Sequence, residues 1–142
     1  MRERELVQRL ARADQCLEAM RALVGGVIAT ELRRVRVTDA AFTALIDGIQ
    51  DPNARVRWWC IQLLEHISDQ RAIDAIVPAL NDPVPRVPRN AAHAVGCALC
   101  KQGWDGIVRA DVVETLARMA VSDENAKVRA QARLTLACRG VG

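Results

Sequence analysis

Apolar residues recur at intervals of three and four along most of the chain, which is the spacing of one face of an α-helix. Three segments follow this template, at Phe42, Leu45, Ile46 and Ile49, at Ile73, Ile76, Val77 and Leu80, and at Val113, Leu116, Ala117 and Ala120. No alternation of apolar and polar residues competes with it. The pattern therefore predicts an all-α fold.

A second apolar stripe follows each of these segments, and it begins five residues after an Asp that all three repeats share. The sequences read DPNARVRWWCIQLLEHI from Asp51, DPVPRVPRNAAHAVGCA from Asp82 and DENAKVRAQARLTLACR from Asp123. The aligned apolar positions are Val56, Cys60, Leu63, Leu64 and Ile67, then Val87, Ala91, Ala94, Val95 and Ala98, then Val128, Ala132, Thr135, Leu136 and Arg139. Two helices and a turn, repeated three times, are typical of a stacked helical array.

Residues 2–24 carry one further stripe, which predicts a single amphipathic helix that ends at Gly25 and Gly26. Its apolar positions are Leu6, Leu10, Ala13, Leu17, Met20 and Val24. Thr38 is the expected N-cap of the next helix. We therefore expect one domain, with a helical cap over 1–37 and helix pairs over about 38–69, 70–101 and 107–140 within 38–142. The loop at 101–106 accounts for the longer spacing between the last two repeats.

Over residues 38–140 the repeat resembles the HEAT-repeat family, in particular the short bacterial repeats of the phycobilisome-lyase type. The resemblance rests on the D-x-x-x-x-V-R motif and implies a short α-α superhelix. It also implies a ladder between adjacent repeats, made by the turn Asp and the Arg after Val. The matching positions are Asp51, Asp82 and Asp123 for the acid, and Arg57 and Arg129 for the base. Repeat two departs from the motif, because Pro88 occupies the Arg position.

Two features within the repeats carry further expectations. Pro78 lies deep in its helix and should bend it, whereas Pro88 in a first turn costs little. In repeat three, Arg133 and Arg139 occupy positions that are apolar in the earlier repeats. Polar residues of this kind keep the last unit of a helical stack soluble.

The charge distribution argues against a generic nucleic-acid binder, which would carry a basic excess over its main body. Residues 1–37 hold eight arginines and five carboxylates, and residues 38–142 hold twelve basic and twelve acidic side chains, so the net +3 lies in the N-terminal part. The N-terminus shows no apolar segment of a secretory signal, and no apolar run is long enough for a membrane span. Together with an odd number of cysteines, five, these features predict a cytoplasmic protein.

HEAT-type arrays usually bind their partners through a surface lined by the second helices of each repeat. Helical geometry places one row of residues opposite the core stripe of those helices. The proposed partner-binding residues are Arg55, Trp58, Gln62, Arg86, Arg89, His93 and Lys127, with Glu65 and Leu134 in the same row. An exposed Trp beside Arg is typical of an interface, although Trp58 could instead pack against the N-terminal segment. One repeat position carries a cation in all three repeats, at Arg55, Arg86 and Lys127. These cations indicate either an acidic partner or local pairing with the loop Asp residues.

The reactive residue types do not form a catalytic, cofactor or metal site. The pair Cys97 and Cys100 lies late in a helix, whereas redox pairs begin one. No second CxxC or His pair completes a zinc site. His66, Cys97 and Cys138 share a repeat position, but neighbouring helices lie too far apart for one ion. Neither His66 nor His93 has a spaced acid–base partner.

The sequence therefore predicts a non-catalytic protein-interaction module without cofactor or metal, as a monomer or a homodimer. Its partner is expected to be a protein, with an acidic surface if the shared cations bind it. The alternative is a nucleic-acid binder that recognises damaged bases, motivated by Trp58 among Arg55, Arg86 and Arg89 and by RRVR at 33–36. Among enzymes, the resemblance leaves a HEAT-like lyase or DNA glycosylase as alternatives. An enzyme that uses His66 or His93 would need a deep polar cavity beside the imidazole.

Overall fold

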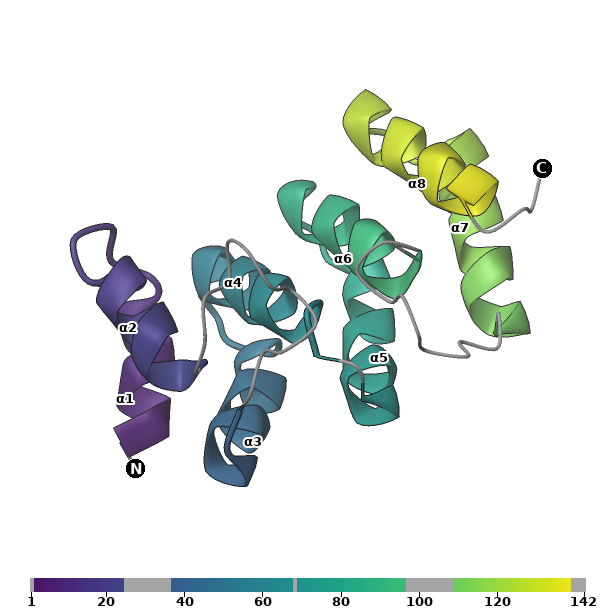
Figure 1. The fold of residues 1–142 in the computed structure, drawn as a ribbon. Coiled ribbons are helices and arrows are strands. Elements are labelled where there is room, and N and C mark those ends of the chain that lie inside the picture. The colour runs from purple at the N-terminus through teal and green to yellow at the C-terminus, as the bar shows by residue number, and fades with distance from the viewer. Residues whose placement is uncertain (1, 25–36, 68, 97–108, 139–142) are drawn as a thin grey trace. The chain divides into compact units, whose positions relative to one another are not determined.

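The computed structural model describes residues 2–24, 37–67, 69–96 and 109–138, and all their regular elements are helical. This confirms the all-α prediction and the short solenoid of helix pairs (Figure 1). The elements are α1 (Arg2–Arg9), α2 (Cys16–Leu23), α3 (Asp39–Gly48), α4 (Ala54–Leu64), α5 (Gln70–Ile76), the 3-10 helix η2 (Val77–Asn81), α6 (Arg86–Gly96), α7 (Ala110–Ser122) and α8 (Ala126–Cys138).

The chain divides into two compact units, Met1–Ala72 (unit 1) and Ile73–Gly142 (unit 2), and the division falls within α5. Helices α3 and α4 fall inside the first predicted repeat, α5, η2 and α6 inside the second, and α7 and α8 inside the third. The repeat boundaries and the assignment of 1–37 as a cap stay predictions.

The prediction of a single helix over residues 2–24 is wrong, because α1 and α2 form a helix pair. Between them, Leu10, Ala11 and Arg12 donate their amide hydrogens three residues back, as in the tight turn that ends a helix. Helix α2 then restarts in a new register, so that Cys16, Ala19 and Leu23 are buried. Of the expected stripe, Ala13 and Leu17 are exposed and Met20 is half-buried. In unit 1, α1 packs against α2, α3 and α4 (Figure 1).

The shared Asp shapes the turn between the helices of each repeat. In repeats one, two and three its Oδ1 accepts a hydrogen bond from the amide two residues later, at 2.8 Å in Asp51, 2.9 Å in Asp82 and 2.9 Å in Asp123. Such Asx turns set the chain direction before a helix. Asn53 and Asn125 then cap the following helices by accepting from Arg55 N and Lys127 N. Thr38 caps α3 as predicted, because its Oγ1 accepts from Ala41 N at 3.1 Å.

The Arg of the repeat motif holds the turn of its own repeat. Arg57 Nη1 donates to the carbonyl oxygens of Asp51 at 2.9 Å and Pro52 at 3.0 Å. Arg129 Nη1 makes the same contacts with Asp123 at 2.7 Å and Glu124 at 3.2 Å. These carbonyls follow the first helix and lack partners within it, so the guanidinium satisfies them. The ladder between adjacent repeats stays a prediction.

The second helices bury the predicted stripe, as shown by Val56, Cys60 and Leu64 in α4 and by Val87 and Ala91 in α6, all 0% exposed. Val128, Ala132 and Thr135 of α8 are also buried. These positions form the core of each helix pair, so the prediction is confirmed for them. Leu136 is half-buried, and Ala98 and Arg139 lie outside the described residues. Arg133 is exposed, whereas Ile61 and Ala92 at the equivalent positions are buried.

The first helices follow the sequence less closely. Around Pro78 the α-helix ends at Ile76 and continues as η2, because proline has no amide hydrogen to donate and its ring clashes with the preceding turn. Pro88 lies in the first turn of α6 without interrupting it. In repeat three the expected stripe is wrong in part, since Ala117 is exposed and Val113 half-buried. The uninterrupted helix α7 instead buries Val112, Leu116, Met119 and Ala120.

Candidate interaction surface

The row of residues predicted to face away from the core lies at the surface in unit 2. Helices α6 and α8 pack against each other there (Figure 1). Arg86 and Lys127 lie four residues after their shared Asp, and Arg89 and Ala130 lie seven after it. All four side chains are exposed. His93 is half-buried, and Leu134 at the equivalent position is 57% exposed.

The equivalent row of unit 1 is partly covered. Arg55, Trp58 and Gln62 are all half-buried. Arg55 Nε donates to the carbonyl oxygen of Leu10 at 3.1 Å, so its guanidinium ties α4 to the end of α1. The sequence predicted this cation for a partner, and the structure gives it a contact inside unit 1.

Trp58 packs edge-on against Trp59, with ring centroids 4.8 Å apart and an angle of 89° between the ring planes. This is one of the preferred geometries of aromatic pairs. The pair makes Trp58 a well-fixed side chain on α4, and its role as an interface anchor stays a prediction.

Glu65 was expected in the same outward row, and this is wrong, because the residue is 1% exposed. It follows α4 directly and keeps helical dihedral angles, φ −54° and ψ −34°. The equivalent residue of repeat two, Gly96, is also buried. In repeats one and two the position held by Glu65 and Gly96 is therefore covered, and the outward row ends before it.

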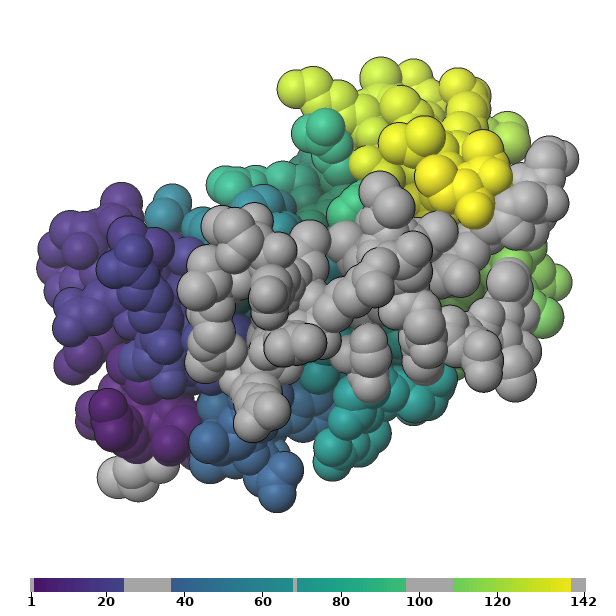
Figure 2. All heavy atoms as spheres, viewed as in Figure 1, coloured from purple at the N-terminus to yellow at the C-terminus, as the bar shows by residue number. Residues whose placement is uncertain are grey.

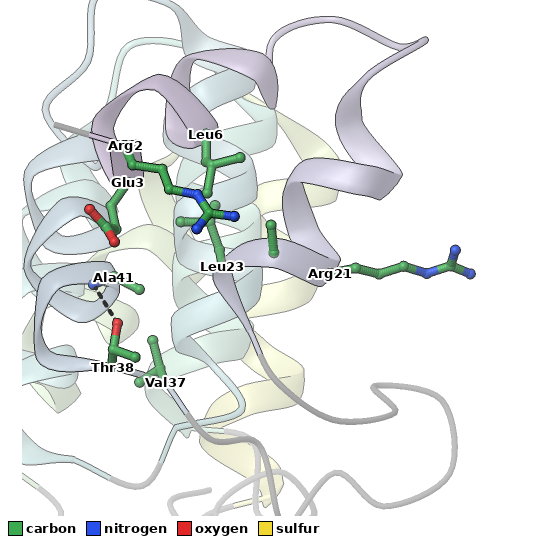
Figure 3. Close-up of a pocket in the computed structure, with 9 residues that line it drawn as sticks. Arg2, Glu3, Leu6, Arg21, Leu23, Val37, Thr38 and Ala41 are labelled. Atoms are coloured by element: carbon green, nitrogen blue, oxygen red, sulfur yellow. Dashed lines mark hydrogen bonds between the residues drawn. The ribbon is translucent and has the colours of Figure 1, made fainter.

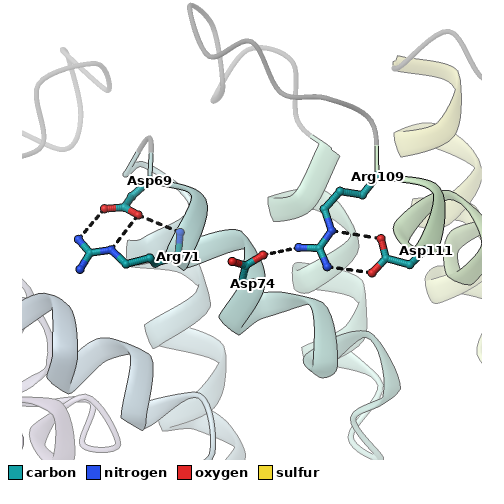
Figure 4. Close-up of polar contacts among 5 residues, drawn as sticks. All are labelled: Asp69, Arg71, Asp74, Arg109 and Asp111. Carbon is teal, nitrogen blue, oxygen red and sulfur yellow. Dashed lines mark hydrogen bonds and ion pairs between the residues drawn. The ribbon is translucent and has the colours of Figure 1, made fainter.

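An arginine between two carboxylates fixes the start of α7 in unit 2 (Figure 4). Arg109 donates to Asp111 through Nε at 3.1 Å and through Nη2 at 2.9 Å, and its Nη1 contacts Asp74 of α5. These hydrogen bonds raise the pKa of Arg109 and lower the pKa of Asp111. Asp111 also lies in the first turn of α7, where the helix dipole favours a negative charge. The cluster is therefore a structural link between two helices.

In unit 1 a second ion pair lies at the start of α5 (Figure 4). Arg71 donates to both oxygens of Asp69, at 3.1 Å and 2.8 Å, which lowers the pKa of Asp69 and raises that of Arg71. The guanidinium carbon of Arg71 also lies 4.6 Å from the ring centre of Phe42 in α3. Arg71 thus links the first turn of α5, which belongs to unit 1, to α3 through a cation–π contact.

Unit 1 contains a cavity of about 450 Å³ that was not predicted from the sequence. Its walls come from α1, α2 and the start of α3 (Figure 3), and the lining residues are Arg2, Glu3, Leu6, Arg21, Ala22, Leu23, Val37, Thr38 and Ala41. Arg21 extends away from the cavity in this view. A single helix would have separated Arg2 from Arg21 by about 28 Å along its axis. Only the break between α1 and α2 brings them to one cavity, and no spacing signal marks it.

A second cavity, of about 360 Å³, lies in unit 2 between the turns that carry Asp82 and Asp123. Both carboxylates already accept amide hydrogen bonds within their Asx turns. Arg118 donates to Asn81 at its edge at 3.2 Å. No group of three or more His, Cys, Asp or Glu side chains that could hold a metal ion occurs in the described segments.

The cysteines whose surroundings are described differ in exposure. Cys16 and Cys60 are buried and Cys138 is exposed, and all three are free thiols. Burial, with a smaller contribution from the negative charge of Asp51, raises the pKa of Cys60 to about 12. A thiol that stays protonated is a poor nucleophile. Cys97, Cys100, Arg139, the 33–36 RRVR sequence and the 101–106 loop lie outside the described residues.

Within the described residues, no helix is both long and apolar enough to span a membrane. No curated protein matches the chain significantly. The family model for HEAT repeats matches residues 42–137, about two thirds of the chain, and covers the three helix pairs from α3 to α8. The resemblance to the HEAT-repeat family is thereby confirmed, and the chain belongs to that family, whereas the likeness to the phycobilisome-lyase type stays a prediction.

Proposed function

We propose that the protein is a non-catalytic interaction module that binds a protein partner through the outward row of its second helices. HEAT repeats commonly serve as protein-interaction scaffolds. The observation that supports this role is the row on α6 and α8, where Arg86, Arg89, Lys127 and Leu134 are exposed on neighbouring helices of one unit. Interfaces combine exposed apolar side chains with arginines in this way.

Other features of the chain support a binding role over a chemical one. The ion pairs at Arg109 and Arg71 are used to hold helices together, and Cys60 has its thiol pKa raised to about 12. The Asp residues of the motif shape turns. These ion pairs and turn carboxylates thus have structural tasks. The cytoplasmic location is part of the same proposal and rests on the odd cysteine count.

The alternative of nucleic-acid binding has less support. The aromatic pair Trp58 and Trp59 could stack on bases, but Trp58 is half-buried and Arg55 beside it bonds to Leu10. Helices α6 and α8, which carry exposed cations, contain no Phe, Tyr or Trp for stacking. A titration with DNA at low salt checks the alternative, since such binding would fall steeply as salt rises.

Affinity capture from native lysate, followed by mass spectrometry, tests the proposed function. The wild-type chain is compared with the double variant Arg86→Glu and Arg89→Glu on α6, and with Glu114→Lys and Val121→Ser on the exposed side of α7. We expect the α6 variant to lose a specific captured protein and the α7 variant to retain it. A captured set that is the same for all three baits would rule out the second-helix surface.

A further inference from the structure

The charges of unit 2 are separated between its first and second helices. Helices α6 and α8 together carry Arg86, Arg89, Lys127, Arg129 and Arg133, and neither contains an Asp or a Glu. Helix α7, by contrast, carries Asp111 and Glu114 with one Arg. Overall the region from residue 38 onward is balanced, with twelve basic and twelve acidic side chains. The positive charge of α6 and α8 therefore results from an uneven distribution of charged residues among the helices, because the region as a whole has no basic excess.

The structure leaves most of these cations at the surface. Arg129 is half-buried and bonds to the turn carbonyls of Asp123 and Glu124. Arg86, Arg89, Lys127 and Arg133 are exposed. In Figure 2 the atoms of α8, in yellow, reach the surface of unit 2. A ligand that approached the two helices would meet positive charge from both and no carboxylate within either of them.

An apolar side chain lies among these cations. Leu134 is 57% exposed and has Arg133 beside it and Ala130 one turn before it. Lys127 precedes Leu134 by two helical turns, which is a rise of about 10 Å. A partner that matches this pattern presents carboxylates and, about two turns away, an apolar side chain. An amphipathic acidic helix has that spacing, with its anchors at i and i+7.

We infer that α6 and α8 bind an acidic amphipathic helix of a partner protein, with its carboxylates on Arg86, Arg89 and Lys127 and an apolar side chain on Leu134. This inference rests on the proposed function and adds the chemistry of the partner. It favours a protein over a nucleic acid because Leu134 and Ala130 offer apolar contact. The described residues of unit 2 include no Phe, Tyr or Trp ring on which a base could stack, and the imidazole of His93 is half-buried.

The test measures binding by fluorescence anisotropy of a labelled helical peptide of about 16 residues, with Glu beside a stripe of Leu. A second peptide carries Lys at the Glu positions, and single- and double-stranded DNA serve as further probes. We expect the Glu peptide to bind, and we expect its affinity to fall as salt is added. The Lys peptide should not bind. DNA that binds as tightly as the Glu peptide would overturn the inference, as would no binding of the Glu peptide at about 1 mM, the weakest affinity that counts as recognition here.

Variants locate the binding surface. Arg86→Glu with Arg89→Glu should lower the affinity for the Glu peptide by about tenfold or more, because like charges then face each other. Arg86→Gln with Arg89→Gln should weaken it less and guards against misfolding of the reversed variant. Leu134→Ser should weaken binding at high salt as well. The matched control, Arg9→Glu with Arg12→Glu in unit 1, changes the net charge equally and should leave the affinity within about twofold. Equal loss in the control would overturn the assignment to α6 and α8.

The peptide assay and the lysate capture fail independently. If the Glu peptide does not bind while the α6 variant still loses a captured protein, the acidic partner is wrong and the interaction module stands. If the α6 variant captures the same proteins as the wild type, the proposed function itself is wrong.

Discussion

Thr135 of α8 donates its hydroxyl hydrogen to the main-chain carbonyl oxygen of Ala92 in α6, at a distance of 2.9 Å. Both residues are buried, at 3% and 0% exposure. Gln131 Nε2 donates to the same hydroxyl at 3.3 Å. This bond joins the second helices of repeats two and three, and thereby sets the register in which their outward rows lie side by side.

Replacing Thr135 by Val should destabilise unit 2 by about 1 kcal/mol, because one buried hydrogen bond is lost while the volume is kept. Urea unfolding followed by circular dichroism measures the change. The control is Thr43→Val on α3, an exposed threonine, for which we expect a change within about 0.5 kcal/mol. If Thr135→Val were as stable as the wild type, the bond to Ala92 would contribute nothing to the packing of α6 on α8.

Arg129→Met should cost about 1–2 kcal/mol, since the carbonyl oxygens of Asp123 and Glu124 lose a charged donor at 2.7 Å and 3.2 Å. The equivalent Arg57→Met should behave alike. Arg133→Met, at an exposed position, is the comparison and should change stability by less than about 0.5 kcal/mol. Equal effects of Arg129→Met and Arg133→Met would mean that the turn does not need the guanidinium.

The ladder implied by the family resemblance is tested by a double-mutant cycle in unit 2. Asp82 of repeat two and Arg129 of repeat three are the pair that the motif predicts. If they interact, Asp82→Ala and Arg129→Met should be non-additive by about 0.5 kcal/mol or more. Additive free energies of unfolding would leave both residues with tasks in their own turns alone, as seen in the hydrogen bonds of Asp82 with Val84 and of Arg129 with Asp123.

The repeat architecture could be predicted from the sequence because two kinds of signal agreed. The 3.6-residue period set the helices, and the shared Asp marked their turns; both are local and depend on short-range sterics and hydrogen bonds. Accordingly, Thr38 caps α3, and Val56, Val87 and Val128 are all buried. The outward row on α6 and α8 followed from the same helical geometry.

The predictions were wrong where tertiary contacts determine the end of a helix or the burial of a side chain. The stripe from Leu6 to Val24 kept a helical spacing through a turn, because Ala11 and Ala13 are compatible with either structure. The half-burial of Arg55 depends on the carbonyl oxygen of Leu10, which is forty-five residues away in the chain. The burial of Glu65 likewise depends on neighbours that its sequence position does not reveal. Helical periodicity identifies the side of a helix, but not what covers it.

Gly48 has a packing requirement that allows a sharp test in unit 1. A Cβ atom at this position would lie 2.4 Å from Cys60 Sγ and 2.9 Å from Val7 Cγ1, so α3 could not keep its distance from α4 and α1. Gly48→Ala should therefore destabilise the protein by about 1–3 kcal/mol, despite the better helix propensity of alanine. Adding Cys60→Ala removes the closer atom and should recover part of the loss. A double variant whose free energies of unfolding simply add would contradict the clash.

The buried thiol of Cys60 predicts a dependence of stability on alkaline pH. Its pKa is raised by burial from 9.0 to about 12, so the folded chain holds this proton in a range where the unfolded chain releases it. The contribution is fully present below about pH 9 and is lost as the pH rises toward 12, with a slope approaching about 1.4 kcal/mol per pH unit.

Cys60→Ala removes this titration at the cost of a cavity whose penalty does not depend on pH. The difference in unfolding free energy between wild type and Cys60→Ala should therefore shrink by about 1 kcal/mol between pH 8 and pH 10. Cys138→Ala is the control for the loss of a thiol at an exposed position, and it should change the free energy of unfolding at pH 8 by less than about 0.5 kcal/mol. Parallel curves for Cys60→Ala and the wild type would mean that water reaches the thiol in the folded chain. The packing of α4 against α3 around Gly48 would then be looser than the lack of room for a Cβ atom at this position indicates.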